Sequence, residues 1–222
     1  MSNKYVDTVN FENMMEKQDL TDVEVNIVNA ARRVFIEKGY VAASMGDIAA
    51  EAGIGRTTLN YYFRNKERLF ESVLGQLIDF ILPNIGTIID DDKPFQEKLA
   101  RIIDLYISTI KTYPGFPAFV IGELNRDPEH LYGVFLLYPQ RIEFMRKFRR
   151  LIETGMEEGY LRKMPVIYVV SSLLGLALFP FLLEKPLTDI FLDGKKEAYD
   201  RFTEERKTFI LDVMLKILDP QI

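Results

Sequence analysis

The sequence predicts an all-α fold, and three observations support that prediction. Apolar residues recur at the three- and four-residue spacing of amphipathic helices, and no run alternates apolar and polar residues long enough for a convincing strand. Glycine and proline residues interrupt these segments at intervals of about one helix length. Of the 222 residues, 48% are hydrophobic, which is enough for a substantial core in one or two domains.

The composition also limits the chemistry that the chain can perform. It has no cysteine, which excludes disulfides and thiolate metal ligands, and its single histidine leaves few groups for acid–base catalysis. We find no convergent catalytic motif, so we expect no enzyme activity, no cofactor and no resident metal. The N-terminal segment MSNKYVDTVN lacks the apolar core of a signal peptide, which predicts a cytoplasmic protein.

Residues 1–20 are polar and show no sustained period, so we expect an N-terminal arm. Its acidic residues outnumber its basic ones, which disfavours an arm that enters the minor groove of DNA. The first clear helix begins at Thr21, which can form a capping box with Glu24, and we expect it to end at Gly39. Its predicted buried stripe is Ile27, Ala31, Val34 and Phe35.

Two short helices joined by a tight turn are predicted between Ser44 and Phe63. Ser44 and Asp47 can form a second capping box, and Gly53 tolerates the positive φ that ends the first helix. Gly55 can cap the second helix. We expect Ile48, Ala49 and Ala52 to face inward from the first helix of the pair.

The second helix of the pair has a polar outward face. Only Leu59 and Phe63 are expected to be buried, whereas the other side chains are those that hydrogen-bond base edges and phosphates. A solvated helix pair with two tyrosines against a neighbour is the alternative, but the turn, the helix lengths and this polar face together favour a helix-turn-helix. The predicted contacts are Arg56, Thr57, Thr58, Asn60, Tyr61 and Tyr62.

At these residues the chain resembles the TetR (tetracycline-repressor) family. Residues 43–49 are Ala-Ser-Met-Gly-Asp-Ile-Ala, 52–55 are Ala-Gly-Ile-Gly, 58–63 are Thr-Leu-Asn-Tyr-Tyr-Phe and 66–69 are Lys-Glu-Arg-Leu. The order and spacing match over about the first third of the chain. Gly55 replaces a usual serine, and Asn60 replaces a usual tyrosine with an amide that could bond adenine. The resemblance adds Ser44 and Lys66 to the predicted DNA contacts.

The net charge of −5 does not exclude DNA binding, because binding needs a local patch rather than bulk charge. Between Gly53 and Phe70 there are four cations and one acid, a local charge of +3. We hypothesise that the acidic remainder limits nonspecific binding. A helix over Lys66–Leu82 is then predicted to end before Pro83 and to act as a lever between domains, with Lys66 near a phosphate at its positive N-terminus.

Beyond Pro83, Gly86 and residues 90–92 predict a loop, and further helices are expected from Pro94, from Pro117 to about Asn125, and from Pro139 to Glu157. Aromatic residues are dense across these proline-broken segments. Most are expected in the core, but broken helices pack with gaps, and the family resemblance implies an effector pocket here. The candidate lining is Tyr106, Tyr113, Phe116, Phe119, Glu123, Phe135, Tyr138 and Phe148.

Glu123, Asp127 and His130 have helical spacing and could hold a metal, but Pro128 interrupts that face, so a surface or core histidine is favoured. The basic residues between Arg146 and Arg150 have acidic neighbours, which favours a solvated helix face over a nucleic-acid patch.

Residues 164–183 are uncharged, which on length alone is compatible with a membrane span. Two prolines, two serines and the lack of a second span favour core or interface instead. A last helix is predicted over about residues 198–218. Together the two helices predict a four-helix homodimer interface and no membrane contact, and the family resemblance implies the same interface. The candidate interface residues are Ser172, Gly175, Leu176, Phe179, Phe202, Phe209, Val213 and Met214.

These segments predict an arm at 1–20, a helix-turn-helix domain at 21–66, and an effector-binding and dimerisation bundle at 67–222. We expect a homodimer that binds a near-palindromic double-stranded operator and is released by a small molecule, as a repressor rather than an activator. The alternative is a DNA-binding regulator without a small-molecule effector, either constitutive or controlled by a protein partner.

Overall fold

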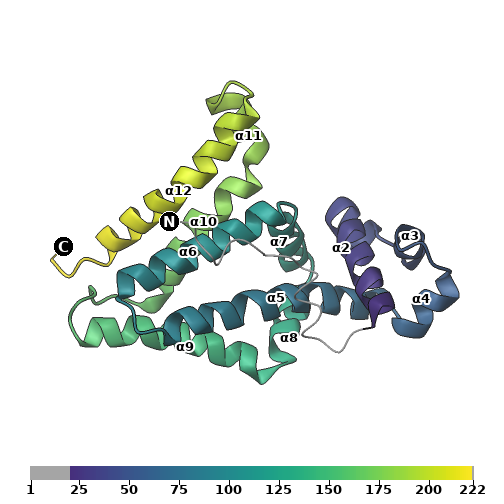
Figure 1. Ribbon diagram of the computed structural model, residues 1–222, viewed down its shortest axis with the longest axis horizontal. Coiled ribbons are helices and arrows are strands. Elements are labelled where there is room, and N and C mark those ends of the chain that lie inside the picture. The colour runs from purple at the N-terminus through teal and green to yellow at the C-terminus, as the bar shows by residue number, and fades with distance from the viewer. Residues whose placement is uncertain (1–20, 222) are drawn as a thin grey trace. The chain divides into compact units, whose positions relative to one another are not determined.

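The computed structural model describes residues 21–221 and contains, within that range, eleven α-helices and no strand (Figure 1). The all-α prediction is therefore confirmed, whereas the predicted arm at 1–20 lies outside the described residues. The described chain forms two compact units, one from residues 21–81 and 115–142 and the other from 82–114 and 143–221. These units group the helices differently from the functional domains predicted above, which stay a prediction.

The first unit is built on α2, which packs against α3 and α7, while α3 packs against α4 and α7 against α8. Its helices are α2 (Asp22–Ala42), α3 (Met45–Glu51), α4 (Arg56–Tyr62), the first part of α5 (Lys66–Asp90), α7 (Phe116–Arg126), α8 (Pro128–Leu136) and the start of α9 (Pro139–Glu157). The capping box predicted at Thr21 is present, with the Thr21 amide donating to Glu24 Oε2 at 2.9 Å. At Gly39 φ is +73°, and this residue interrupts α2 without ending it.

An aromatic cluster forms part of the core of this unit. The Phe70 ring centroid lies 4.9 Å from that of Phe119 and 5.9 Å from that of Phe35, and all three side chains are buried. These residues come from α5, α7 and α2, so three helices share one apolar contact. The predicted inward stripe of α2 is buried as expected.

A buried arginine connects three helices of the first unit. Arg141 of α9 is 2% exposed and donates from Nε and Nη2 to the two carboxylate oxygens of Asp79 of α5, at 2.8 and 2.7 Å. It also donates to the carbonyl of Val134 of α8 at 2.5 Å. A β-carbon at Gly75 would lie 2.9 Å from Arg141 Nη2, so glycine there leaves room for the guanidinium.

The predicted end of the helix at Leu82 is wrong, because α5 continues through Pro83 to Asp90. Proline removes one backbone hydrogen bond, but Leu82 and Ile88 on either side of it are both 7% exposed, so their burial favours a continuous helix. Gly86 lies in α5 rather than in a loop. A β-carbon there would come within 2.6 Å of the Phe144 ring, so glycine permits close packing.

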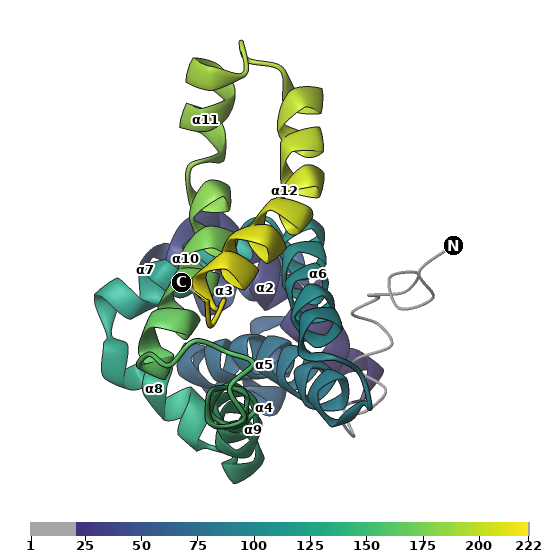
Figure 2. The same ribbon diagram turned by 90° about the vertical axis from the view of Figure 1, so that its left-hand side faces the viewer.

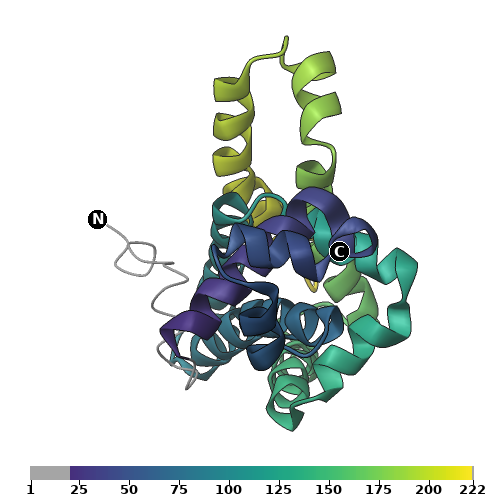
Figure 3. The same ribbon diagram turned by 90° about the vertical axis from the view of Figure 1, so that its right-hand side faces the viewer.

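The second unit is a helical bundle whose core unites four helices. It contains the rest of α5 and α9 with α6 (Phe95–Thr112), α10 (Val166–Leu182), α11 (Glu184–Phe191) and α12 (Lys196–Ile217). Its buried core includes Ile103 and Ile107 of α6, Ile152 of α9, Val169 and Leu173 of α10, and Ile210 and Met214 of α12. Figures 2 and 3 show α11 and α12 side by side and joined by a short turn. The sequence did not predict α11.

Two parts of the described chain have the composition of a membrane span. One is α5, although half of its most apolar stretch is buried within the structure. The other is α10 with α11, which are long enough only together and are bent by 70° relative to each other. Buried core helices meet the same criteria, so this is weak evidence for a membrane.

Candidate nucleic-acid interface

The helix pair predicted from Ser44 to Phe63 is present as α3 and α4. The Ser44 amide donates to Asp47 Oδ2 at 2.9 Å, and the Asp47 amide donates to Ser44 Oγ at 3.1 Å, so the predicted capping box starts α3. Gly53 adopts φ +68° in the turn, a conformation that favours glycine. Gly55 is the N-cap of α4, as predicted.

The recognition helix, α4, has the two-sided character that the sequence predicts. Leu59 is fully buried and Phe63, which follows the helix, is 8% exposed. Tyr61 is 82% exposed and its ring meets that of Tyr62 edge-on, with 5.2 Å between centroids. The remaining predicted contacts on this helix, Arg56, Thr57, Thr58 and Asn60, are all exposed.

The acidic groups of α3 are paired with cations from α2. Lys38 Nζ lies 2.8 Å from Asp47 Oδ1, and Arg33 Nε lies 2.5 Å from Glu51 Oε1. The hydrogen bond from Lys38, followed by those from Ser44, lowers the pKa of Asp47 from 3.8 to about 2. Beside the recognition helix the negative charge of α3 is therefore largely compensated, which favours the approach of a polyanion.

Lys66 has a different environment from the one predicted. Its Nζ donates to the carbonyls of Tyr40, Val41 and Ala43, at 2.7, 3.3 and 2.9 Å. An ammonium has three protons, so these bonds occupy all of them. In this geometry Lys66 ties the start of α5 to the end of α2, and the predicted phosphate contact would require it to release one of these bonds.

Glu123 and His130, two residues of the weighed metal group, lie together in the first unit. Glu123 is 2% exposed and its Oε1 accepts from His130 Nδ1 at 2.5 Å, while Arg126 donates to both of its oxygens. Burial raises the pKa of Glu123, but the hydrogen bonds from Arg126 and His130 outweigh burial and lower it overall. Asp127 instead caps α8 by accepting from the His130 amide at 3.0 Å.

The other candidate effector residues do not form one set in the structure. Phe116 and Phe119 are buried in the first unit with the aromatic cluster, and Phe135 and the exposed Tyr138 also belong to that unit. Tyr106 and Phe148 pack against the core of the second unit, to which Tyr113 also belongs. The effector pocket therefore stays a prediction.

The candidate interface residues lie on α10 and α12 with different exposures. Phe179 is 59% and Phe209 53% exposed, and Gly175 is exposed as well. Ser172, Leu176, Phe202 and Val213 are half-buried. Met214 is fully buried in the core of its own unit, so it is unavailable to a partner and its assignment to the interface is corrected.

The basic stretch of α9 is a paired surface, as expected. Arg149 Nε lies 2.7 Å from Glu153 Oε1, Arg150 pairs with Glu143, and Lys147 Nζ lies 2.5 Å from Asp90 Oδ2. These pairs balance three of the four basic residues of this stretch, which favours a solvated face over a nucleic-acid patch.

A capped three-helix unit with one short polar helix presented to solvent defines a helix-turn-helix DNA-binding protein. The family model for bacterial regulatory proteins of the tetR family matches residues 27–73, which contain α3, α4 and most of α2. Over these residues the chain matches the tetR family, and the curated relatives that it resembles are described as transcriptional regulators.

Relatives and solved structures agree with this assignment. The chain is 22% identical over 191 residues to "Probable HTH-type transcriptional regulator YttP" of Bacillus subtilis, a match that covers 84% of this chain and 91% of that protein. It is 32% identical over 88 residues to the HTH-type transcriptional regulator RutR of Escherichia coli, covering 40% and 41%. The TetR family regulator PfmR of Thermus thermophilus has the same fold, with a TM-score of 0.64, 21% identity, and coverage of 86% and 97%.

Proposed function

We propose that the chain is a homodimeric repressor that binds a near-palindromic operator through α4 and is released from it by a small molecule. The observation that supports this most directly is the burial pattern of α4, in which Leu59 is fully buried while the polar side chains around it are exposed. A helix whose function was only packing would not need a guanidinium, two hydroxyls and a carboxamide on its outer face.

Direct base contacts are assigned to the amide and hydroxyl groups of the recognition helix. Asn60 can hydrogen-bond adenine through its carboxamide. Thr58 can hydrogen-bond a base edge with its hydroxyl or pack its methyl group against that of thymine. We assign phosphate contacts to Arg56, Thr57, Tyr61 and Tyr62. Ser44 was predicted as a further contact, but its hydroxyl donates to Asp47 Oδ2 at 2.6 Å, so it would have to release that bond to reach a phosphate. Among residues 21–221, no ion pair involves Arg56, so its guanidinium is available to an anion.

The dimer interface is assigned to an exposed apolar surface on the second unit. Seven large apolar side chains of α10, α11 and α12 are between 44% and 73% exposed: Ile167, Tyr168, Leu174, Phe179, Ile190, Phe191 and Phe209. An apolar surface of this kind is typical of a protein interface. Three of these side chains lie on α11 and α12, the adjacent helices of Figures 2 and 3.

A double substitution tests this interface. Phe179→Asp with Phe209→Asp places two charges where the partner would bury apolar rings, and we expect a monomer by light scattering after size-exclusion chromatography. Ile36, which is also exposed but lies on α2, gives the control Ile36→Asp, which should stay dimeric. A wild-type monomer, or a dimer that survives the double substitution, would exclude this interface.

Release by a small molecule requires that the ligand bind two dimer shapes unequally. We assign the link between ligand binding and the recognition helix to α5, because this single helix begins shortly after α4 and continues into the second unit. The effector pocket itself stays a proposal, and its predicted lining is divided between the two units as described above. The proposal includes the cytoplasmic location that the sequence predicts.

Transcription in vitro tests the repressor. A template that carries an operator selected from random DNA should give less transcript when the protein is added, and a ligand found by thermal-shift screening should restore it. More transcript would identify an activator. Repression that no stabilising ligand relieves would favour the second candidate, a regulator without a small-molecule effector.

A further inference from the structure

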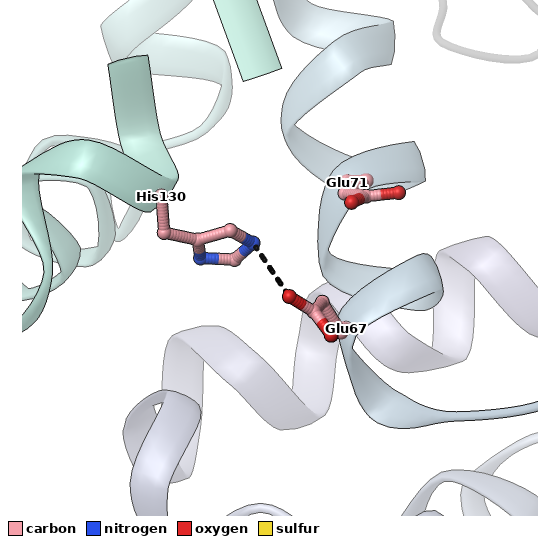
Figure 4. Close-up of side chains that lie close together, drawn as sticks. All are labelled: Glu67, Glu71 and His130. Atoms are coloured by element: carbon pink, nitrogen blue, oxygen red, sulfur yellow. Dashed lines mark ion pairs between the residues drawn. The ribbon is translucent and has the colours of Figure 1, made fainter. Parts of the chain in front are cut away.

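Three potential metal ligands from two helices of the first unit converge beside the start of α5. Glu67 and Glu71 are four residues apart on the first turns of α5, so they share one face, and His130 approaches them from α8 (Figure 4). One ligand atom of each lies within 4.8 Å of the others. Of these three residues, the sequence pattern indicated only His130 as a possible metal ligand.

The hydrogen bonding of His130 orients one ring nitrogen toward the two carboxylates. Its Nδ1 lies 2.5 Å from Glu123 Oε1 and 3.2 Å from Arg126 Nη2. The carboxylate contact is the shorter, and an ionised carboxylate can only accept, so we assign the proton to Nδ1. Nε2 is buried and has no hydrogen-bond partner within residues 21–221, and it faces Glu67 Oε1 at 3.9 Å. In the neutral ring Nε2 presents a lone pair to two carboxylates, of which Glu71 also pairs with Arg68 at 3.2 Å, and a bound cation would satisfy this arrangement.

The surroundings of His130 resemble those of a metal-binding histidine. Metal-binding histidines usually donate their other ring nitrogen to a carboxylate, and here Glu123 accepts that bond while its side chain is 1% exposed. Arg126 holds Glu123 and lies 4.2 Å from the centroid of the Tyr40 ring. The Phe70 ring lies 5.0 Å from the imidazole. The histidine is therefore fixed before any ligand binds.

We propose that Glu67, Glu71 and His130 bind a divalent first-row transition metal ion, with Glu123 as the residue that positions the histidine. One imidazole and two carboxylates suit ions such as Zn²⁺ and Mn²⁺, with water in the remaining positions. Bonds of about 2.0–2.2 Å require the ligand atoms to approach one another by about 1 Å or more. Glu67 is 58% exposed at its side chain, so it can rotate to close that gap.

A metal at this place would join α8 to the first two turns of α5, and only three residues separate the start of α5 from the end of α4. The ion would thereby restrain the support of the recognition helix, and we infer that its binding changes operator affinity. This second step rests on the proposed function, whereas the metal site does not.

Calorimetric titration of tag-free, chelator-treated protein with ZnCl₂ and with MnCl₂ tests the site. We expect one ion per chain for at least one of the two metals, at least tenfold weaker binding in Glu67→Gln/Glu71→Gln and in His130→Gln, and a loss of about tenfold to a hundredfold in Glu123→Gln. Glu129→Gln, an exposed neighbour of His130, is the matched control and should bind as the wild type does. Circular dichroism checks that each variant is folded.

The absence of binding in the wild type, or equal binding by folded Glu67→Gln/Glu71→Gln, would overturn the metal site and favour a protonated His130 paired with its carboxylates. If ions bind as expected, fluorescence anisotropy of a labelled operator tests the second step. Operator affinity should change with the metal in the wild type and stay constant in Glu67→Gln/Glu71→Gln. Metal binding without any change in operator affinity would overturn the regulatory step and leave the site intact.

Discussion

Replacing Lys66 with methionine separates support of the recognition helix from direct contact with DNA. Methionine keeps an apolar stem of similar length but cannot donate to the three carbonyls at the end of α2. Hydrogen bonds to charged groups contribute about 1.5–3 kcal/mol each when fully buried, but Lys66 is only half-buried. We therefore expect a total loss of about 2 kcal/mol in the free energy of unfolding, which corresponds to a Tm lower by about 4–8 °C for a chain of this size.

The salt dependence of operator binding distinguishes the two roles. Each phosphate contact that is lost reduces the slope of log K against log salt by about 0.9. Because Lys66 bonds to its own chain, Lys66→Met should leave this slope unchanged while Tm falls. Arg56→Ala is the contrasting control: its side chain is exposed, so Tm should stay within about 1–2 °C of the wild type while the slope falls.

Fluorescence anisotropy between about 50 and 200 mM salt gives the slope, and calorimetric melting gives Tm. A lower slope with an unchanged Tm in Lys66→Met would refute the assignment made here and restore Lys66 as a phosphate ligand.

Three further predictions concern other parts of the first unit. Thr58→Ala and Asn60→Ala should change the sequences recovered from a random DNA pool, and unchanged preferences in both would remove them from the base-contacting set. Arg141→Met should lower the free energy of unfolding by about 3 kcal/mol in urea, because it leaves Asp79 and the carbonyls of Val134 and Gly75 without their buried donor. Adding Asp79→Leu should recover part of that loss, and strict additivity of the two free-energy changes would argue against the ion pair. Because the pKa of Asp47 is lowered to about 2 in the folded protein, its stabilising effect is present above about pH 4 and is lost as pH falls toward 2, so Asp47→Asn should weaken the acid dependence of unfolding, and an unchanged profile would contradict it.

Local signals explain why much of the helix-turn-helix could be predicted from sequence. The capping boxes at Thr21 and Ser44 and the positive φ of Gly53 depend on residues within four positions of one another. The buried and exposed sides of α4 follow from helical spacing in the same way, because Leu59 and Phe63 are one turn apart.

Long-range contacts explain what the sequence did not predict. Lys66 bonds to carbonyls between 23 and 26 residues away, and no local pattern distinguishes such a lysine from one that meets a phosphate. Arg141 and Asp79 are 62 positions apart. The four-residue spacing of Glu67 and Glu71 was visible, but only the fold brings His130 to them.

Pro83 shows how tertiary packing overrides a local rule. Proline disfavours a helix interior, yet the apolar residues on both sides of Pro83 are buried and α5 continues. The same limit applies to Met214, because helical spacing could not tell whether its side of α12 faces the core or a partner.

Methylation protection of a selected operator tests most directly whether α4 binds the major groove. Guanine N7 lies in the major groove, so a bound helix shields it from methylation. With guanines placed in each half-site, we expect two protected patches on one face of the duplex, separated by about one helical turn or a multiple of it, and their loss in a variant that carries Thr58→Ala and Asn60→Ala. Bound protein that leaves every major-groove guanine reactive would contradict the account.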